Sequence, residues 1–113
     1  MNPINVSIRN IGKSADDLRF FIYEDSAHAG GITVHSISGE AFSYGVAIAR
    51  EKRNRSVAKA ALPLLYDFMK MRGFSRVFAD IAPENAASLA LHASLGFTET
   101  RRTAQAIRME KTL

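Results

Sequence analysis

The apolar residues of this sequence change their spacing near residue 56, and this change limits the possible folds more than any other feature. Before that point they alternate with polar residues or form short apolar runs, which is typical of strands. Between residues 57 and 72 they recur at intervals of three and four, which predicts an amphipathic helix. A chain that reads as strands first and helices afterwards belongs to the α+β class.

The boundaries of the expected elements come from turn and capping residues. Four strands are expected in the first half, at residues 4–8, 18–24, 32–38 and 41–49. The helix at 57–72 has Ser56 as its expected N-cap and Gly73 as its stop. A strand at 76–82 follows, then a helix that starts at Pro83 and ends before Gly96, and closing strands at 97–103 and 104–110. The predicted order is β-β-β-β-α-β-α-β-β, a mixed sheet crossed by helices.

Size and composition exclude several classes of protein. A chain of 113 residues is expected to form one domain over residues 1–113. It has no cysteine, so disulfides and thiolate zinc sites are excluded, and its three histidines lack metal-ligand spacing, so no metal is expected. No apolar run approaches the roughly 20 residues that cross a bilayer. The amino terminus lacks the apolar block of a signal peptide, so we expect a cytoplasmic protein without a membrane partner.

The positive charge is concentrated in one segment. Residues 50–59 contain five basic residues and one acid, so this decapeptide accounts for the whole net charge of +4. It lies between a predicted strand and the start of a predicted helix, where free backbone N–H groups and the helix dipole favour anions. Such a compact patch suits a ligand with several phosphates, although a solvated basic loop is equally consistent with the charge.

The same segment resembles the pyrophosphate loop of the GNAT N-acetyltransferases, which use acetyl-CoA. Their pattern is Arg or Gln, two residues, Gly, one residue, then Gly or Ala. Here Arg53 and Ala58 match, whereas Ser56 stands where glycine is usual. The resemblance implies that acetyl-CoA is the cosubstrate and that residues of this loop bind it, namely Arg53, Asn54, Arg55, Ser56, Val57, Ala58 and Lys59.

A second match lies in the predicted helix near residue 90. Asn85, Ser88, Leu91 and Gly96-Phe97 occupy family positions, and His92 replaces the usual tyrosine. With the order of elements, the resemblance covers residues 18–113. Asn85, Ser88 and His92 also share one helical face by their spacing. From the residues alone, Asn85 could equally cap the helix while Ser88 and His92 face solvent.

The resemblance implies direct attack of an amine on the acetyl thioester. Asn85 and Ser88 are then expected to contact the pantetheine arm, and His92 is the candidate acid for the departing thiolate. The family's oxyanion donor, a backbone N–H of the fourth strand, falls near Ala47, Ile48 or Ala49. No base is assigned, because only Ser43 and Tyr44 are polar candidates on that strand.

One departure from the family bears on the acceptor and on assembly. GNAT proteins usually have two helices between the first two strands, but residues 12–17 are too few for a helix pair. We therefore expect the acceptor side to be open or to be completed by another subunit, and on this basis we predict a homodimer. The acceptor is a small-molecule or peptide amine.

Two other functions remain open. The chain could keep the fold and CoA binding without turnover, which the serine at 56 and the histidine at 92 favour. It could also be a small nucleic-acid-binding domain, but the basic segment lacks interleaved aromatic residues, so no nucleic-acid partner is expected.

Overall fold

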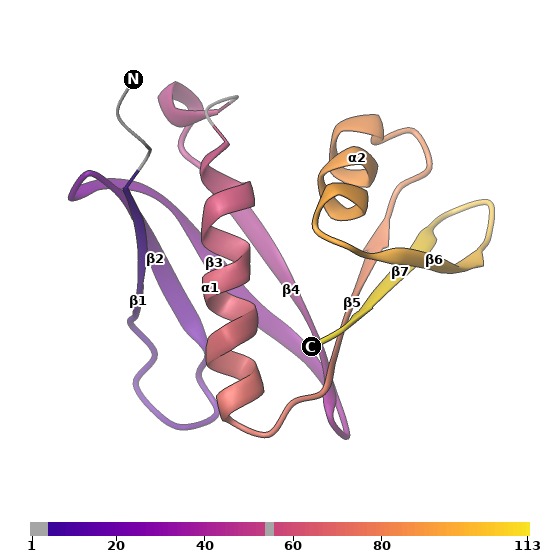
Figure 1. Cartoon of the computed structure of the whole chain (residues 1–113), viewed down its shortest axis with the longest axis horizontal. Coiled ribbons are helices and arrows are strands. Elements are labelled where there is room, and N and C mark those ends of the chain that lie inside the picture. Colours follow the sequence, from indigo (N-terminus) through magenta and orange to yellow (C-terminus); the bar gives the residue numbers. More distant parts are fainter. Residues whose placement is uncertain (1–4, 54–55) are drawn as a thin grey trace.

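The computed structural model describes residues 5–53 and 56–113. Within these ranges a seven-stranded mixed sheet has the order β1-β2-β3-β4-β5-β7-β6 (Figure 1). The strands are β1 (Val6–Asn10), β2 (Arg19–Glu24), β3 (Ala27–Ser38), β4 (Ala41–Ile48), β5 (Arg76–Ile81), β6 (Thr98–Arg102) and β7 (Ile107–Thr112). The helices are η1 (Arg50–Lys52), α1 (Val57–Met71) and α2 (Ala86–Ser94). The predicted class and order of the main elements are confirmed.

Helix α1 packs lengthwise against the first four strands (Figure 1). Its Phe68 meets Phe20 of β2 edge to face, with ring centroids 5.2 Å apart. The helix continues through Pro63, and its buried face consists of Val57, Ala61, Leu62, Leu65, Tyr66 and Met69. The apolar spacing that predicts this helix includes Leu64 and Met71, but these two side chains are 38% and 90% exposed, because the buried stripe runs through Leu62 and Met69 instead.

Strands β4 and β5 are parallel neighbours for only two residue pairs, Ala41 with Arg76 and Phe42 with Val77. Beyond these pairs the strands separate, and Figure 1 shows them as the two arms of a V. Strand β5 keeps its ladder on the other side, since all of its residues pair with β7. The edge of β4 that faces the gap therefore has no strand to bond beyond Phe42.

Three predicted boundaries were wrong. Strand β3 begins at Ala27, so His28 lies in a strand and not in a turn. Helix α2 begins at Ala86 and not at Pro83, because Asn85 occupies the N-cap and its side chain accepts the N–H of Ser88. The last strand runs over 107–112, since residues 103–106 form the turn that was predicted to be strand.

Strands β1 and β2 form a hairpin with five paired residues each and no helix between them. The sheet face opposite α1 consequently carries shallow grooves lined by strand and loop residues without any helix residue. Phe21 is 38% exposed on this face and packs its ring edge on His28, with centroids 4.8 Å apart. In residues 5–53 and 56–113 no helix is both long and apolar enough to span a membrane.

Gly30 is needed where β3 and β4 approach each other. A Cβ built at Gly30 would lie 2.1 Å from the Ala47 carbonyl oxygen, whereas one at Gly31 meets its nearest atom at 3.4 Å. We expect Gly30→Ala to lower the free energy of unfolding by about 1–3 kcal/mol through overpacking. Gly31→Ala, the matched control, should change it by less than about 1 kcal/mol. Urea unfolding of both variants measures the difference, and equal stabilities would contradict this account of the strand contact.

Candidate functional site

A cavity of about 450 Å³ lies in the gap between β4 and β5, which is within the size range of small-molecule sites. Its walls come from both arms of the V, from β3 and β7, and from the inner face of α2. The lining residues are His35, Ser36, Ser43, Tyr44, Val46, Phe78, Ala79, Asp80, Ile81, Ser88, His92 and Arg108. Of the residues predicted for the site, Tyr44, Ser43, Ser88 and His92 are brought together here.

A buried chain of hydrogen bonds connects this cavity to α1. The Tyr44 hydroxyl lies 2.5 Å from the Tyr66 hydroxyl and 3.0 Å from Nε2 of His92. The Tyr44 and His92 rings stack with an interplanar angle of 24°, and the edge of His92 meets Phe97. All four rings are less than a tenth exposed. These hydrogen bonds join three elements that are distant in sequence: β4, α1 and α2.

The partners fix the direction of each hydrogen bond. Nδ1 of His92 lies 2.8 Å from the Ser88 carbonyl oxygen, which can only accept, so Nδ1 carries the proton. A neutral His92 then accepts at Nε2 from the Tyr44 hydroxyl, whose oxygen in turn accepts from Tyr66. Burial lowers the pKa of His92, although the bond to Ser88 opposes that shift. Burial also raises the pKa of both tyrosines, that of Tyr44 to about 12.

His92, the predicted acid for the departing thiolate, lines the cavity from α2. It is only 4% exposed, and both ring nitrogens already have partners. Tyr44 lines the same cavity, and its hydroxyl is the partner of Nε2 of His92. Sequence reasoning missed Tyr66, because it lies on the apolar face of α1 between Leu62 and Met69 and reads there as core.

The backbone of β4 narrows the choice of oxyanion donor. The Ala49 N–H donates to the Ala29 carbonyl at 2.7 Å, so it points toward β3 and is engaged. Since backbone groups alternate along a strand, Ala47 also points toward β3, whereas Val46 and Ile48 point toward the gap. Of the three expected residues, Ile48 keeps an available N–H.

The start of α1 has the free N–H groups expected of an anion site. The first helical bond runs from the Ala60 N–H to the Ser56 carbonyl, which leaves the N–H groups of Val57, Ala58 and Lys59 without helical acceptors. Ser56 is left-handed, with φ 61° and ψ 21°, and its side chain makes no capping bond. Ser56 is thus the N-cap by position, as predicted, but its side chain does not cap the helix, because a capping serine needs extended backbone. The same conformation explains why glycine is usual at this position.

The basic loop is held in place from two sides. The Lys52 ammonium donates to the buried Glu24 carboxylate at 3.1 Å, so Lys52 is committed to the protein. Nε of Arg53 donates to the Ile48 carbonyl at 3.1 Å, and the remaining guanidinium nitrogens extend from an exposed side chain. Asn54 and Arg55 lie outside the described residues.

Asn85 acts as a helix cap, which was one of the two roles left open for it. Its Oδ1 accepts the Ser88 N–H at 3.1 Å, and this cap does not use the two donors of its Nδ2. Asn85, Arg53 and the first residues of α1 are not among the residues that line the cavity.

The outer side of the cavity carries a charge pair that sequence reasoning also missed. Arg108 of β7 binds Asp80 of β5 through two bonds of 2.8 Å, and its guanidinium lies 4.6 Å from the centroid of Phe78. Arg108 lowers the pKa of Asp80 through these bonds. The pairing of β5 with β7 sets the two side chains opposite each other, a register that no local pattern reveals. No group of three metal-ligating side chains occurs in the described ranges.

Comparisons with known proteins identify the family and the fold. The acetyltransferase (GNAT) family model matches residues 5–97. A curated relative, the ribosomal protein bS18-alanine N-acetyltransferase of Escherichia coli K12, is 27% identical over 82 residues, which cover 73% of this chain and 55% of the relative. The chain thus spans about half the length of the curated relatives it matches.

Two solved structures show the same fold. The PaiA N-acetyltransferase of Thermoplasma acidophilum, solved with coenzyme A, has a TM-score of 0.76 at 19% identity and covers 87% of this chain and 62% of its own. A domain from Methanocaldococcus jannaschii has a TM-score of 0.81 at 16% identity and covers 98% of this chain and 100% of its own. With the family match over most of its length, the chain belongs to the GNAT acetyltransferase family.

Proposed function

We propose that this chain is an acetyl-CoA-dependent N-acetyltransferase in which an amine attacks the thioester directly. The observation that carries the proposal is the gap between β4 and β5, where an unpaired strand edge, a cavity and a buried acid–base pair lie together. Direct transfer requires that the amine and thioester be held in contact, that an N–H stabilise the oxyanion, and that protons move. The gap offers groups for each requirement.

The residues at the start of α1 are proposed to hold the diphosphate of the cosubstrate. The N–H groups of Val57, Ala58 and Lys59 supply donors, and Lys59 and Arg53 add positive charge. Ser56, Asn54 and Arg55 complete the predicted loop. The pantetheine amides would pair with the free edge of β4 at Val46 and Ile48, and Nδ2 of Asn85 and the Ser88 hydroxyl would bind them from α2.

A second candidate is a protein that binds CoA without turnover. The full engagement of both ring nitrogens of His92 favours it, since the family's acid position then has no free proton. Both candidates bind CoA at the same site, but only the first releases CoA thiol when an amine is present. A cytoplasmic location stays a prediction from the sequence.

The left-handed Ser56 gives a test of the cosubstrate site. Ser56→Gly should raise the free energy of unfolding by about 1 kcal/mol, because glycine adopts this conformation without strain, and should bind CoA at least as tightly. Ser56→Val should lower stability and weaken CoA binding, since a β-branched residue resists positive φ. Urea unfolding and calorimetric titration with CoA measure both effects. Wild-type affinity in Ser56→Val would contradict the placement of the diphosphate.

The acceptor is proposed to be the amino terminus of a polypeptide. The curated relative acts on a protein alanine by its name, and the cavity of about 450 Å³ between β4 and β5 has room for a terminal residue. A polyamine fits less well: among the described lining residues Asp80 is the one carboxylate, and Arg108 already neutralises it.

Release of CoA thiol with a panel of amines tests both the activity and its acceptor. We expect kcat/KM for short peptides with a free amino terminus to exceed that for spermidine by at least tenfold. The same peptides with a blocked amino terminus serve as controls and should release no thiol above hydrolysis. CoA binding without thiol release from any amine would favour the second candidate.

The chain is also proposed to form a homodimer through the uncovered face of β2 and β3. Light scattering after size exclusion at micromolar concentration should give about twice the chain mass of 12.4 kDa. Phe21→Lys should shift the protein to the monomer, because the exposed ring lies centrally on that face, while Met71→Lys, exposed on α1, should not. A strictly monomeric wild-type protein would contradict the proposal.

A further inference from the structure

We propose that Tyr44, and not His92, is the catalytic residue that exchanges protons with the reacting atoms, and that His92 and Tyr66 act through it. This inference rests on the proposed acetyltransferase function and assigns the base that sequence reasoning left open. It concerns the chain of hydrogen bonds Tyr66–Tyr44–His92, which links the cavity between β4 and β5 to α1.

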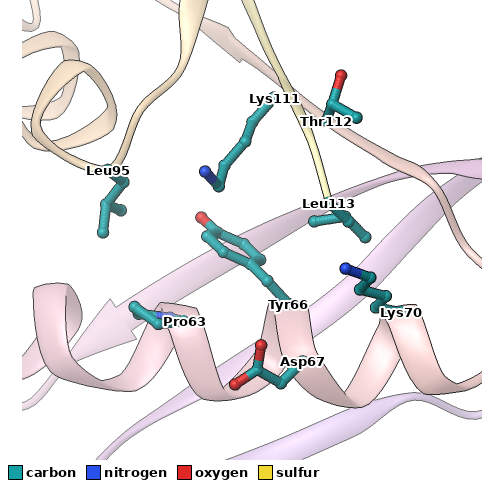
Figure 2. Close-up of a pocket in the computed structure, with 8 residues that line it drawn as sticks. All are labelled: Pro63, Tyr66, Asp67, Lys70, Leu95, Lys111, Thr112 and Leu113. Atoms are coloured by element: carbon teal, nitrogen blue, oxygen red, sulfur yellow. The ribbon is translucent and has the colours of Figure 1, made fainter.

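Tyr44 lines the cavity and keeps 8% of its surface exposed. Tyr44 projects from the arm of the V whose free edge faces the gap, and its hydroxyl is the middle member of the chain. Tyr66 does not line this cavity; it lines a separate groove of about 310 Å³ between α1 and the end of β7. Figure 2 shows its ring projecting from α1 into that groove, toward Leu95 and Lys111.

The Ser88 carbonyl holds the His92 proton on Nδ1, so Nε2 offers a lone pair to the Tyr44 hydroxyl. A tyrosine that both donates to an imidazole and accepts from a phenol can pass a proton inward and take it back. Tyr66 keeps the Tyr44 hydroxyl pointed at His92, because its own O–H occupies one lone pair of the Tyr44 oxygen at 2.5 Å.

Among the described groups near the gap, no other is a better candidate. Asp80 is bound by Arg108, and His35 is exposed and contacts the Ser36 hydroxyl at 3.3 Å. The groove that Tyr66 faces is lined by Asp67, Lys70 and Lys111, and none of these three lines the cavity between β4 and β5.

Tyr44 and His92 together can take up and return every proton that the reaction moves. The amine nitrogen attacks the thioester carbon, and the carbonyl electron pair moves to oxygen. The ammonium proton of the adduct passes to the Tyr44 oxygen while the Tyr44 proton moves to Nε2 of His92, which becomes cationic. When the C–S bond breaks and its electron pair goes to sulfur, the proton returns from Nε2 through Tyr44 to give the free thiol of CoA. No other reactant is consumed, and His92 and Tyr44 end as they began.

Kinetics with Tyr44→Phe test the assignment. Loss of a positioned acid–base group costs about 10²–10⁴-fold in rate, so kcat for peptide acetylation should fall by more than tenfold, while KM for acetyl-CoA changes by less than threefold. Tyr66→Phe removes the hydroxyl that orients Tyr44 but keeps the Tyr44 hydroxyl itself. Its kcat should therefore fall by less than that of Tyr44→Phe. Tyr23→Phe, the matched control on β2, should keep wild-type kcat.

A spectroscopic measurement is independent of turnover. In protein labelled with ¹⁵N-histidine, long-range ¹H–¹⁵N correlation should show His92 protonated on Nδ1 with a hydrogen-bonded Nε2. In Tyr44→Phe the Nε2 resonance should move toward that of a free imidazole nitrogen, and in Tyr23→Phe it should stay in place. This readout also shows that each variant is folded.

The outcomes separate this inference from the proposed function. An active wild-type protein whose Tyr44→Phe variant keeps kcat within tenfold, or whose His92 is protonated on Nε2, overturns the proton shuttle and leaves the acetyltransferase standing. If kcat falls as much in Tyr66→Phe as in Tyr44→Phe, the assignment of Tyr44 as the catalytic residue is overturned. A wild-type protein that binds CoA and releases no thiol with any amine overturns both.

Discussion

The separation of β4 and β5 after two residue pairs is the constraint on which the rest of the structure depends. Continuous pairing would satisfy the backbone of β4 and leave no room beside it. Because the strands separate at Phe42 and Val77, the outward N–H groups of Val46 and Ile48 remain open, and a cavity forms between the arms. A gap inside a sheet needs other contacts to hold its sides, and the buried chain from Tyr44 to Tyr66 and His92 provides them. The same feature thus opens the cavity and brings Tyr44 and His92 together at its wall.

The start of α1 adds an electrostatic feature to this frame. The loop before it is strongly basic, but its charges have different roles: Lys52 is bound by Glu24, and Arg53 partly by the Ile48 carbonyl. The free N–H groups of the first turn are therefore as important for an anion as the side chains are. Ser56 has a left-handed backbone, which is unfavourable for serine, at the point where the N–H groups of the first turn of α1 converge.

Much of the fold was predictable because it rests on local patterns. Alternating apolar residues predicted the first strands, and the three-and-four spacing predicted α1. The errors occurred where a longer-range contact decided. The third strand was expected to start at residue 32, after Gly30. Gly30 lies inside β3 instead, where β4 approaches too closely for a side chain. Asn85 is a different case, since its Oδ1 makes the local capping contact that the sequence had left open as one of two roles. Leu64 and Leu62 are chemically alike, and only the position of the sheet determines which of them is buried.

The sequence by itself determined the class of fold, the family and the segment that carries the positive charge, because each depends on residues close together in the chain. It also marked His92 as an unusual residue at a functional position. Only the tertiary structure shows what His92 contacts, since Tyr44 and, through it, Tyr66 come 48 and 26 positions earlier in the chain. The Asp80–Arg108 pair and the direction of the β4 N–H groups depended in the same way on strand register. Hydrogen bonds between distant elements are set by packing geometry, and no pattern of neighbouring residues contains that information.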